Sequence, residues 1–164
     1  MGLFNFFKKK EEKWIEIYAP VNGIVIPLSE VPDEAFALKM IGDGCAIIPE
    51  EGAIYAPIDG EIDIFETNHA VSIEAFKNFE MIVHFGIDTV KLDGKGLKRI
   101  TEIGNVKKGD KLIEYDLGYI KKNAKSIITP IVITNMDIVK KIDVVIDYDH
   151  HVKAGDLLMK VLIK

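Results

Sequence analysis

The chain has 164 residues, of which 48% are hydrophobic and 29% charged, a composition typical of a globular protein. Its formal net charge of −5 argues against a nucleic-acid partner, because the negatively charged nucleic-acid backbone binds basic surfaces. A single cysteine, Cys45, excludes an intramolecular disulfide framework and fits a reducing compartment. At this length we expect one domain over residues 15–164, preceded by a flexible tail over residues 1–14.

The start of the chain combines aromatic side chains with a run of lysines. Its sequence from residue 1 to residue 10 is MGLFNFFKKK. The order is wrong for a secretory signal, in which basic residues precede a longer apolar region. Residues 2–10 could contact an anionic membrane surface weakly, or they could form a disordered tail. No apolar run approaches the roughly 20 residues of a spanning helix, so we expect a cytoplasmic protein, with peripheral contact to the inner membrane face as an option.

From Ile15 onward, short runs rich in Ile and Val alternate with turn sequences, as in an antiparallel β-sandwich or barrel. Asn22-Gly23 and Asp59-Gly60 are suited to tight turns that need a positive φ. Residues 31–40 could form a short helix or a turn capped by Asp33, and residues 117–125 could form another behind Asp116. The sequence therefore predicts an all-β fold with few short helices.

Two pairs of short segments resemble each other. Residues 18–25 (YAPVNGIV) resemble residues 55–62 (YAPIDGEI), and residues 107–112 (KKGDKL) resemble residues 153–158 (KAGDLL). The offsets of 37 and 46 residues differ, whereas a solenoid needs one fixed period. We expect two related β-motifs folded against each other, although common turn sequences could also produce such similarity.

His69 and His84 lie in two segments that read as a hairpin. If they are paired, the turn is centred between Phe76 and Lys77. Directly opposite residues bring their Cβ atoms to about 4.5–5.5 Å, so two imidazoles could share a phosphoryl group or a metal ion. No Asn-Gly-type turn fixes the register, and a slip of a residue or two stays open.

Regular strands would place alternate side chains on one face. Phe65, Thr67 and His69 would then point to one side of their strand, and Ile82 and His84 would share a face of theirs. The residues expected in the core are Met81, Val83 and Phe85. An imidazole pair beside exposed Phe65 and Ile82 favours a docking surface, because exposed apolar patches usually mark partners. A purely structural histidine pair is the alternative.

The residues around both histidines resemble a known family. Residues 66–70 (ETNHA) and 83–90 (VHFGIDTV), at this spacing, are similar to the glucose-type enzyme IIA of the phosphoenolpyruvate-dependent sugar phosphotransferase system. The similarity runs from about Ile17 to Lys164. It includes residues 31–33 (VPD), 42–44 (GDG), 94–96 (GKG) and 134–137 (TNMD). Residues 33–36 (DEAF) look less apolar than their family counterpart.

The resemblance implies a β-sandwich that relays a phosphoryl group. His84 would be the phosphorylated nucleophile and His69 would hold the phosphoryl oxygens. Thr67 would orient His69, and Asp88 would lie at the rim of the site. The small carrier HPr would donate the phosphate, and the IIB domain of a sugar permease would accept it. The resemblance also implies possible regulatory binding of other transporters or enzymes; we expect a monomer without a cofactor.

The chemistry fits an imidazole, whose unperturbed pKa is about 6.5, so that its neutral form can attack phosphorus at neutral pH. Exposed apolar side chains around the site would dock partners and exclude water. By position, we expect the partner contacts to be Phe36, Met40, Ile41, Phe65, Ile82 and Val90. Ordinary core packing is the alternative for each of them.

Two other classes of function stay open. A zinc hydrolase could use His69 and His84 as ligands, with Asp88 as a poor third; otherwise no metal is expected, except zinc shared with a partner at an interface. A lipoyl or biotinyl carrier needs an exposed lysine in a Met-Lys-Met or Asp-Lys-Ala context, which the sequence lacks. The adjacent His150 and His151 would face opposite ways on a strand and are interpreted as a surface turn. Cys45 is interpreted as a buried hydrophobic residue.

Overall fold

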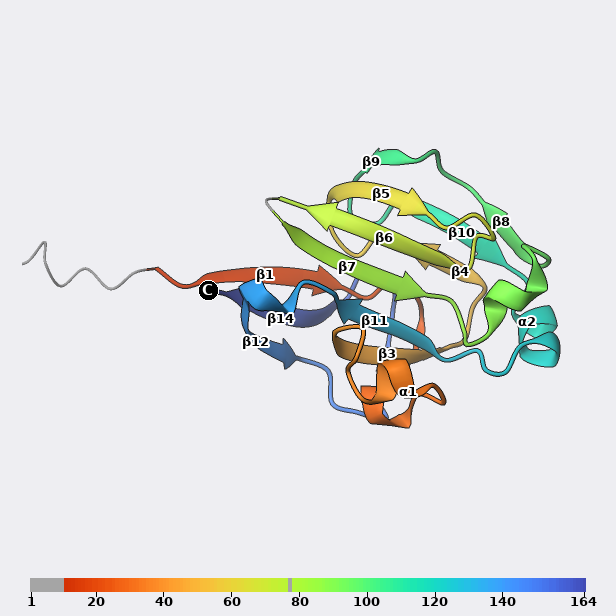
Figure 1. Cartoon of the computed structure of the whole chain (residues 1–164), viewed down its shortest axis with the longest axis horizontal. Coiled ribbons are helices and arrows are strands. Elements are labelled where there is room, and N and C mark those ends of the chain that lie inside the picture. The colour runs from red at the N-terminus through yellow and green to blue at the C-terminus, as the bar shows by residue number, and fades with distance from the viewer. Residues whose placement is uncertain (1–10, 77) are drawn as a thin grey trace, which may run out of the picture.

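The computed structural model describes residues 11–76 and 78–164. Within them antiparallel strands dominate, which confirms the predicted all-β class (Figure 1). The largest sheet has eight strands in the order β13-β2-β3-β11-β7-β6-β5-β9. In chain order these are β2 (Gly23–Ile26), β3 (Asp43–Pro49), β5 (Gly60–Ile64), β6 (Ala70–Ala75), β7 (Phe79–His84), β9 (Gly104–Val106), β11 (Thr129–Ile133) and β13 (His151–Val152).

Two three-stranded sheets complete the strands of the described residues. One has the order β1-β14-β12, with β1 (Lys13–Tyr18), β12 (Val139–Val144) and β14 (Leu157–Ile163). The other has the order β4-β10-β8, with β4 (Ala53–Tyr55), β8 (Leu97–Arg99) and β10 (Lys111–Tyr115). A single cluster of buried aliphatic and aromatic side chains joins all three sheets, so the sheets enclose a common core.

The N-terminal boundary differs from the prediction. Strand β1 begins at Lys13, and Lys13 and Trp14 pair with Ile163 and Leu162 of β14. The predicted tail over residues 1–14 therefore wrongly includes the first two residues of this strand. The candidate membrane contact, residues 2–10, lies outside the described residues. Within the described residues, no helix combines the length and the apolar character that crossing a membrane requires.

The two Tyr-Ala-Pro segments contact each other reciprocally. The N–H of Tyr18 donates to the carbonyl of Pro57 at 2.9 Å, and the N–H of Tyr55 donates to the carbonyl of Pro20 at 2.8 Å. Because residues 18–20 repeat in residues 55–57, these two bonds are equivalent in the sequence as well as in space. The similarity between the segments therefore has a structural counterpart.

Each Tyr-Ala-Pro segment also binds one Gly-Asp turn in the same way. Ala19 donates to the carbonyl of Asp156 at 2.8 Å and accepts from the N–H of Gly155 at 2.9 Å. Ala56 makes the matching pair with Asp110, at 2.8 Å, and Gly109, at 2.9 Å. The prediction of two related β-motifs folded against each other is confirmed by this repeated pattern.

The prediction of positive φ at Gly23 and Gly60 was wrong, since both glycines begin strands, β2 and β5. They are required for a different reason, the close approach of a neighbouring strand. A Cβ on Gly23 would lie 2.1 Å from the carbonyl oxygen of Ile48, and one on Gly60 would lie 2.7 Å from that of Glu74. Positive φ occurs instead in the two Gly-Asp turns, at 89° for Gly109 and 93° for Gly155.

The two predicted α-helices are present, and both are shorter than expected. Helix α1 (Glu34–Ala37) begins after Asp33, whose Oδ1 accepts from the N–H of Ala35 at 2.8 Å. Helix α2 (Leu117–Asn123) begins after Asp116, whose Oδ1 accepts from the N–H of Tyr119 at 2.9 Å. Both caps satisfy N–H groups that the helix itself leaves free. Within the described part of the chain, the 3-10 turns are η2 (Leu28–Glu30), η3 (Thr89–Leu92) and η4 (Met136–Ile138).

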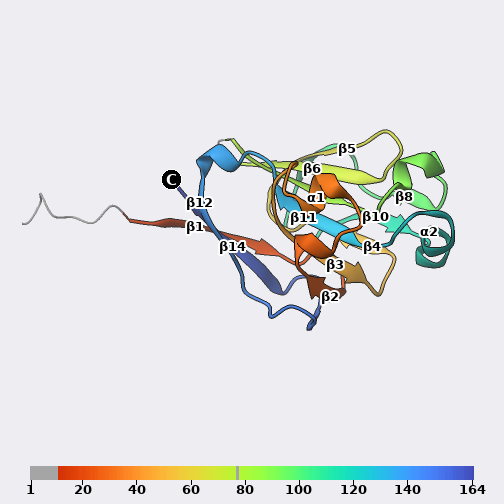
Figure 2. The same cartoon turned by 60° about the horizontal axis from the view of Figure 1, so that its bottom comes forward.

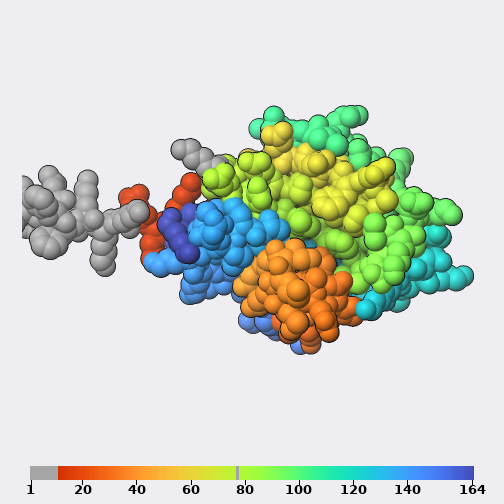
Figure 3. Space-filling view, in the orientation of Figure 1, coloured from red at the N-terminus to blue at the C-terminus, as the bar shows by residue number. Residues whose placement is uncertain are grey.

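The segment with η2 and α1 lies against the large sheet, over β3 and β11 (Figure 2). Leu28, Val31 and Phe36 are buried there in a second apolar cluster that also includes Ala46 and Val132. In the space-filling view the segment, coloured orange, stands out beside the yellow-green surface of β5 to β7 (Figure 3). This segment therefore borders the surface at which the C-terminal end of β7 lies.

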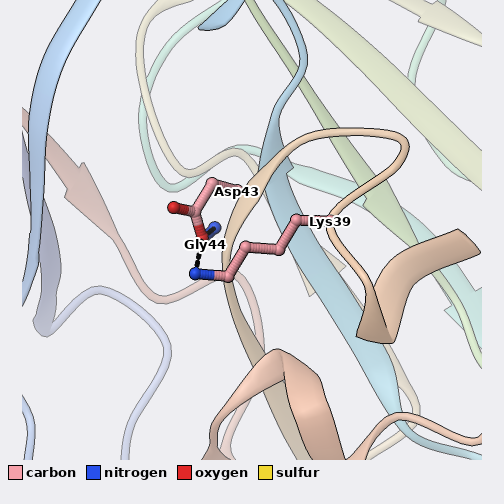
Figure 4. Close-up of polar contacts among 3 residues, drawn as sticks. All are labelled: Lys39, Asp43 and Gly44. Carbon is pink, nitrogen blue, oxygen red and sulfur yellow. Dashed lines mark hydrogen bonds and ion pairs between the residues drawn. The ribbon is translucent and has the colours of Figure 1, made fainter. Parts of the chain in front are cut away.

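A polar contact joins the end of this segment to β3. Lys39 Nζ lies 3.4 Å from Asp43 Oδ1, which also accepts from the N–H of Gly44 at 2.7 Å (Figure 4). Lys39 has a positive φ of 58°, so it reverses the chain after α1. Because the pair is largely exposed, we expect it to contribute little to stability and mainly to orient the turn.

Candidate functional site

The hairpin that carries His84 has a different register from the predicted one. Ala70, and not His69, lies opposite His84 in the β6–β7 pair. Residues 66–69 form a tight turn between β5 and β6, with Asn68 at φ 59° and its N–H bonded to the Phe65 carbonyl at 2.7 Å. The predicted regular strand through Phe65, Thr67 and His69 was therefore wrong.

The two imidazoles nevertheless meet. Their ring centroids are 5.1 Å apart and their planes are inclined by 73°. His69 comes directly before β6, and its carbonyl accepts from the N–H of Phe85 at 2.8 Å, which keeps it beside the end of β7. The predicted core positions Met81, Val83 and Phe85 are all buried, so His84 and Ile82 occupy the opposite face of the strand.

The tautomer of His84 follows from one contact. Its Nδ1 lies 2.6 Å from the carbonyl oxygen of Gly86. Because a carbonyl can only accept, Nδ1 carries the proton and Nε2 carries the lone pair. Gly86 has φ 70°, a backbone conformation that residues with a side chain rarely adopt. The bend at Gly86 turns the Gly86 carbonyl back toward His84.

His69 is held by Thr67, whose Oγ1 lies 2.5 Å from His69 Nδ1. A hydroxyl can donate or accept, so this contact is compatible with both neutral tautomers and with the protonated ring. Phe65 packs edge-on against the same imidazole, with centroids 5.4 Å apart and planes at 87°. His69 is 9% exposed, so these neighbours fix its ring in a nearly buried position.

The imidazoles lie in an open depression of about 350 Å³. Its lining consists of Asp33, Ala35, Phe36, Ile41, Phe65, His69, Ile82, His84, Asp88 and Val90. Five of the six residues expected to contact partners are among them. Met40 is the exception: it follows α1, is not part of the lining and is 72% exposed. Phe36 is mostly buried and touches the His84 ring, with centroids 5.2 Å apart.

Asp33 is a residue of this lining that the sequence identified only as a helix cap. Its carboxylate caps α1 and also lies on the wall of the depression. Asp33 is the N-cap of α1 and Phe36 lies within that helix, so both residues reach the same wall of the depression. A capping residue two or three positions before an apolar wall residue is a signal that could have placed it at the site.

Burial lowers the pKa of both imidazoles below the ordinary value of about 6.5. For His69 the loss of hydration acts first, and repulsion by a charge on His84 adds to it. For His84 the loss of hydration is partly offset by the bond to the Gly86 carbonyl and by the carboxylates of Asp33 and Asp88. At pH 7 the neutral form of both rings is therefore favoured.

Asp88, the residue predicted at the rim, is part of the lining of the depression and has a strained backbone conformation. Its φ is 61°, in the left-handed region, and its carboxylate lies 3.6 Å from Lys91 Nζ. The following residue, Thr89, starts the 3-10 turn η3 and is fully buried. The turn thus fixes Asp88 at the edge of the depression, with a cation beside its carboxylate.

Among residues 11–76 and 78–164, no three His, Cys, Asp or Glu side chains are grouped so that they could hold a metal ion. The zinc-hydrolase alternative therefore has no third ligand in that part of the chain. His150 and His151 are both exposed, and His151 Nδ1 lies 2.9 Å from Glu50. Cys45 is fully buried, and burial raises the pKa of its thiol to about 12, in agreement with a packing role.

Comparison with known proteins identifies the family of this chain. A model of the family described as phosphoenolpyruvate-dependent sugar phosphotransferase system, EIIA 1, matches residues 15–139. The PTS system glucose-specific EIIA component of Borreliella burgdorferi is 48% identical over 145 residues, covering 87% of this chain and 76% of the relative. That of Haemophilus influenzae is 46% identical over 169 residues and covers both chains in full.

A solved structure is also similar. Glucose permease IIA from Mycoplasma capricolum has a TM-score of 0.84 and 37% identity, covering 90% of this chain and 96% of the other. These matches define the class of protein, an EIIA component of a sugar phosphotransferase system. The chain belongs to the EIIA 1 family of the phosphoenolpyruvate-dependent system, the glucose type that the residues around His69 and His84 predicted.

Proposed function

We propose that this chain carries a phosphoryl group on Nε2 of His84, between phospho-HPr and the IIB domain of a glucose-type sugar permease. The observation that carries the proposal is the 2.6 Å contact between His84 Nδ1 and the Gly86 carbonyl. This contact leaves Nε2 unprotonated, so the ring is a nucleophile without any proton transfer. Family membership supports the assignment of the system, and the names of the relatives support glucose.

In the transfer step, the lone pair of His84 Nε2 forms a bond to phosphorus while the phosphorus–nitrogen bond of the donor breaks. The proton on Nδ1 stays in place, so the ring gains positive charge as the new bond forms. The Gly86 carbonyl faces that proton and stabilises the charge. Passing the group to the next acceptor reverses these events, with the neutral imidazole as the leaving group.

His69 serves the phosphoryl oxygens. When Thr67 donates to its Nδ1, the proton of His69 lies on Nε2, on the side away from Thr67, and can be donated to an oxygen of the migrating group. Phosphoryl transfer has a loose transition state that needs positioning and charge stabilisation more than covalent help. A rigid imidazole with centroid 5.1 Å from that of His84 supplies both.

The apolar lining serves as a docking floor. Phe65, Ile82 and Val90 present exposed or half-exposed surface around the imidazoles. A partner that covers them also removes water from the phosphorylated nitrogen, which limits hydrolysis. The open shape suits two successive macromolecular partners better than an enclosed small substrate. Location in the cytoplasm and a monomeric state stay predictions.

The test is a reconstituted transfer with phosphoenolpyruvate, enzyme I and HPr. We expect the chain to gain one phosphate that is labile in acid and stable in base. His84→Ala should gain none, whereas His150→Ala, which removes an exposed imidazole that does not line the depression, should be labelled like the unmodified protein. Labelling of the His84→Ala protein would identify another nucleophile, and no labelling of the unmodified protein would refute the proposed function.

A further inference from the structure

The peptide group between Gly86 and Ile87 makes a hydrogen bond at each end. Its carbonyl accepts from His84 Nδ1 at 2.6 Å, and its N–H donates to the Ser126 carbonyl at 2.8 Å. The imidazole, the peptide and Ser126 therefore form one continuous chain of hydrogen bonds. Ser126 lies in the connection between α2 and β11, and it is not among the residues that line the depression.

Ser126 is itself fixed by its surroundings. Its Oγ accepts from the N–H of Ile128 at 3.0 Å, which closes a small turn before β11. Ile87 and Ser126 also form an isolated antiparallel bridge, and Ile87 is only 1% exposed. Water therefore has little access to the N–H of Ile87, and the Ser126 carbonyl is its partner.

Gly86 makes room for this partner. A Cβ at position 86 would lie 2.5 Å from the Ser126 carbonyl oxygen, a contact that real side chains do not make. The glycine is thus needed twice, for its φ of 70° and for the approach of Ser126. The glycine therefore allows the backbone conformation in which the Gly86 carbonyl accepts from His84 Nδ1.

We infer that the backbone carbonyl of Ser126, acting through the Gly86–Ile87 peptide, positions and polarises the group that fixes the tautomer of His84. A peptide whose N–H is already hydrogen-bonded has a more polar carbonyl, which accepts more strongly. The effect grows when the ring becomes positive, because the Nδ1–H bond then carries a charge. Ser126 is a positioning residue; its effect on the transfer rate rests on the proposed function, whereas its effect on the tautomer does not.

The test weakens the Ser126 carbonyl alone. An amide-to-ester exchange at Ile127 turns that carbonyl into an ester carbonyl, a poorer acceptor, and leaves the Gly86–Ile87 peptide intact. The matched control is the same exchange at Lys125, which weakens the neighbouring Ala124 carbonyl outside the hydrogen-bond chain. Ring ¹⁵N shifts of His84 in the unphosphorylated protein report the tautomer and the pKa, and phospho-HPr reports the rate of phosphate uptake.

With the exchange at Ile127 we expect a smaller fraction of the Nδ1–H tautomer, a lower pKa of His84 and a rate of uptake reduced roughly threefold. With the exchange at Lys125 we expect none of these changes. Equal tautomer fractions in the two ester proteins would overturn the inference. Failure of the unmodified protein to take up phosphate would instead refute the proposed function, and the tautomer measurement would still decide the role of Ser126.

Discussion

The imidazoles of His69 and His84 lie with centroids 5.1 Å apart, although the two residues are not partners across the β6–β7 hairpin. His84 ends β7 opposite Ala70, and His69 reaches it from the turn before β6. The ring of His69 is oriented by Thr67 in that turn rather than by the sheet. This arrangement makes the position of His69 sensitive to the turn, while that of His84 depends on the strand.

Thr67→Val should therefore impair transfer without unfolding the protein. Valine has nearly the same shape but cannot bond to His69 Nδ1, now 2.5 Å from the hydroxyl. A lost bond of about 1 kcal/mol corresponds to roughly fivefold in rate. Rates of phosphate uptake and of transfer to IIB check this, and Thr67→Ser, which keeps the hydroxyl, is the control. Equal rates for the two variants would contradict the role of Thr67.

The lowered pKa values of both histidines predict how stability depends on pH. Each pKa is below its value of about 6.5 in the unfolded chain, so the unfolded chain takes up protons first as the pH falls. The stability that the neutral rings contribute is thus complete above pH of about 6.5 and is lost as the pH falls through the folded pKa values. Denaturant midpoints between pH 7.5 and pH 5, as rough limits, should show this slope.

The double variant His69→Gln, His84→Gln is the control, because it removes both titrating groups and should flatten the slope. The rate of phosphate uptake should stay constant down to about pH 6.5 and fall only at lower pH, where His84 becomes protonated. An NMR titration that placed either pKa above 6.5 would contradict the effect of burial.

Phe65 and Met40 provide a matched pair for the docking floor. Both are exposed and apolar, but Phe65 lines the depression and packs on His69, whereas Met40 is not part of the lining. Phe65→Ala should raise the KM for phospho-HPr by roughly tenfold, as expected for an exposed aromatic anchor that the partner buries on binding, while Met40→Ala should leave it unchanged. Equal effects of the two substitutions would move the interface toward the end of α1.

Much of the site could be predicted from the sequence. The spacing of the two histidines identified the meeting of two imidazoles, and alternation identified Met81, Val83 and Phe85 as the core face of β7. The register could not be predicted, because residues 76–78 contain no dipeptide that fixes a hairpin turn. The positive φ of Asn68, which converts the expected strand into a turn, was equally hidden.

Contacts between distant segments were the other gap. Nothing local to Gly86 indicates that the Ser126 carbonyl needs its space, since 40 residues separate the two. Gly23 and Gly60 show the same difficulty, because their sequence suggested turns while the reason for glycine is a neighbouring strand. Local patterns predict caps such as Asp33 and Asp116 well, because their hydrogen bonds stay within one turn.

Two glycines should respond to alanine in opposite ways. In Gly23→Ala the new Cβ would lie 2.1 Å from the Ile48 carbonyl oxygen, so β2 and β3 must move apart. The free energy of unfolding should therefore fall by about 3 kcal/mol. In Gly118→Ala the nearest atom is Asp116 Oδ1 at 3.5 Å, and the residue is helical. Stability should then rise by about 0.5–1 kcal/mol. Denaturant unfolding checks both signs.

The repeated motifs predict equal consequences for equivalent residues. Asp110 Oδ2 accepts from the N–H of Lys107 at 2.9 Å, and Asp156 Oδ2 accepts from the N–H of Lys153 at the same distance. Asp110→Ala and Asp156→Ala should each lower the free energy of unfolding by about 1 kcal/mol. Asp63→Ala is the control, because Asp63 is exposed on β5 and has no side-chain partner among the described residues.

The rate of phosphate transfer should show that the two turns affect stability and not the function of the site. Neither turn contributes to the lining of the depression, so both variants should accept phosphate from phospho-HPr at the unmodified rate while their denaturant midpoints fall together. The equality follows because each turn binds its Tyr-Ala-Pro segment through the same pair of backbone bonds, at Ala56 for one and Ala19 for the other. A large loss at one aspartate with none at the other would show that only one turn is held by its side chain.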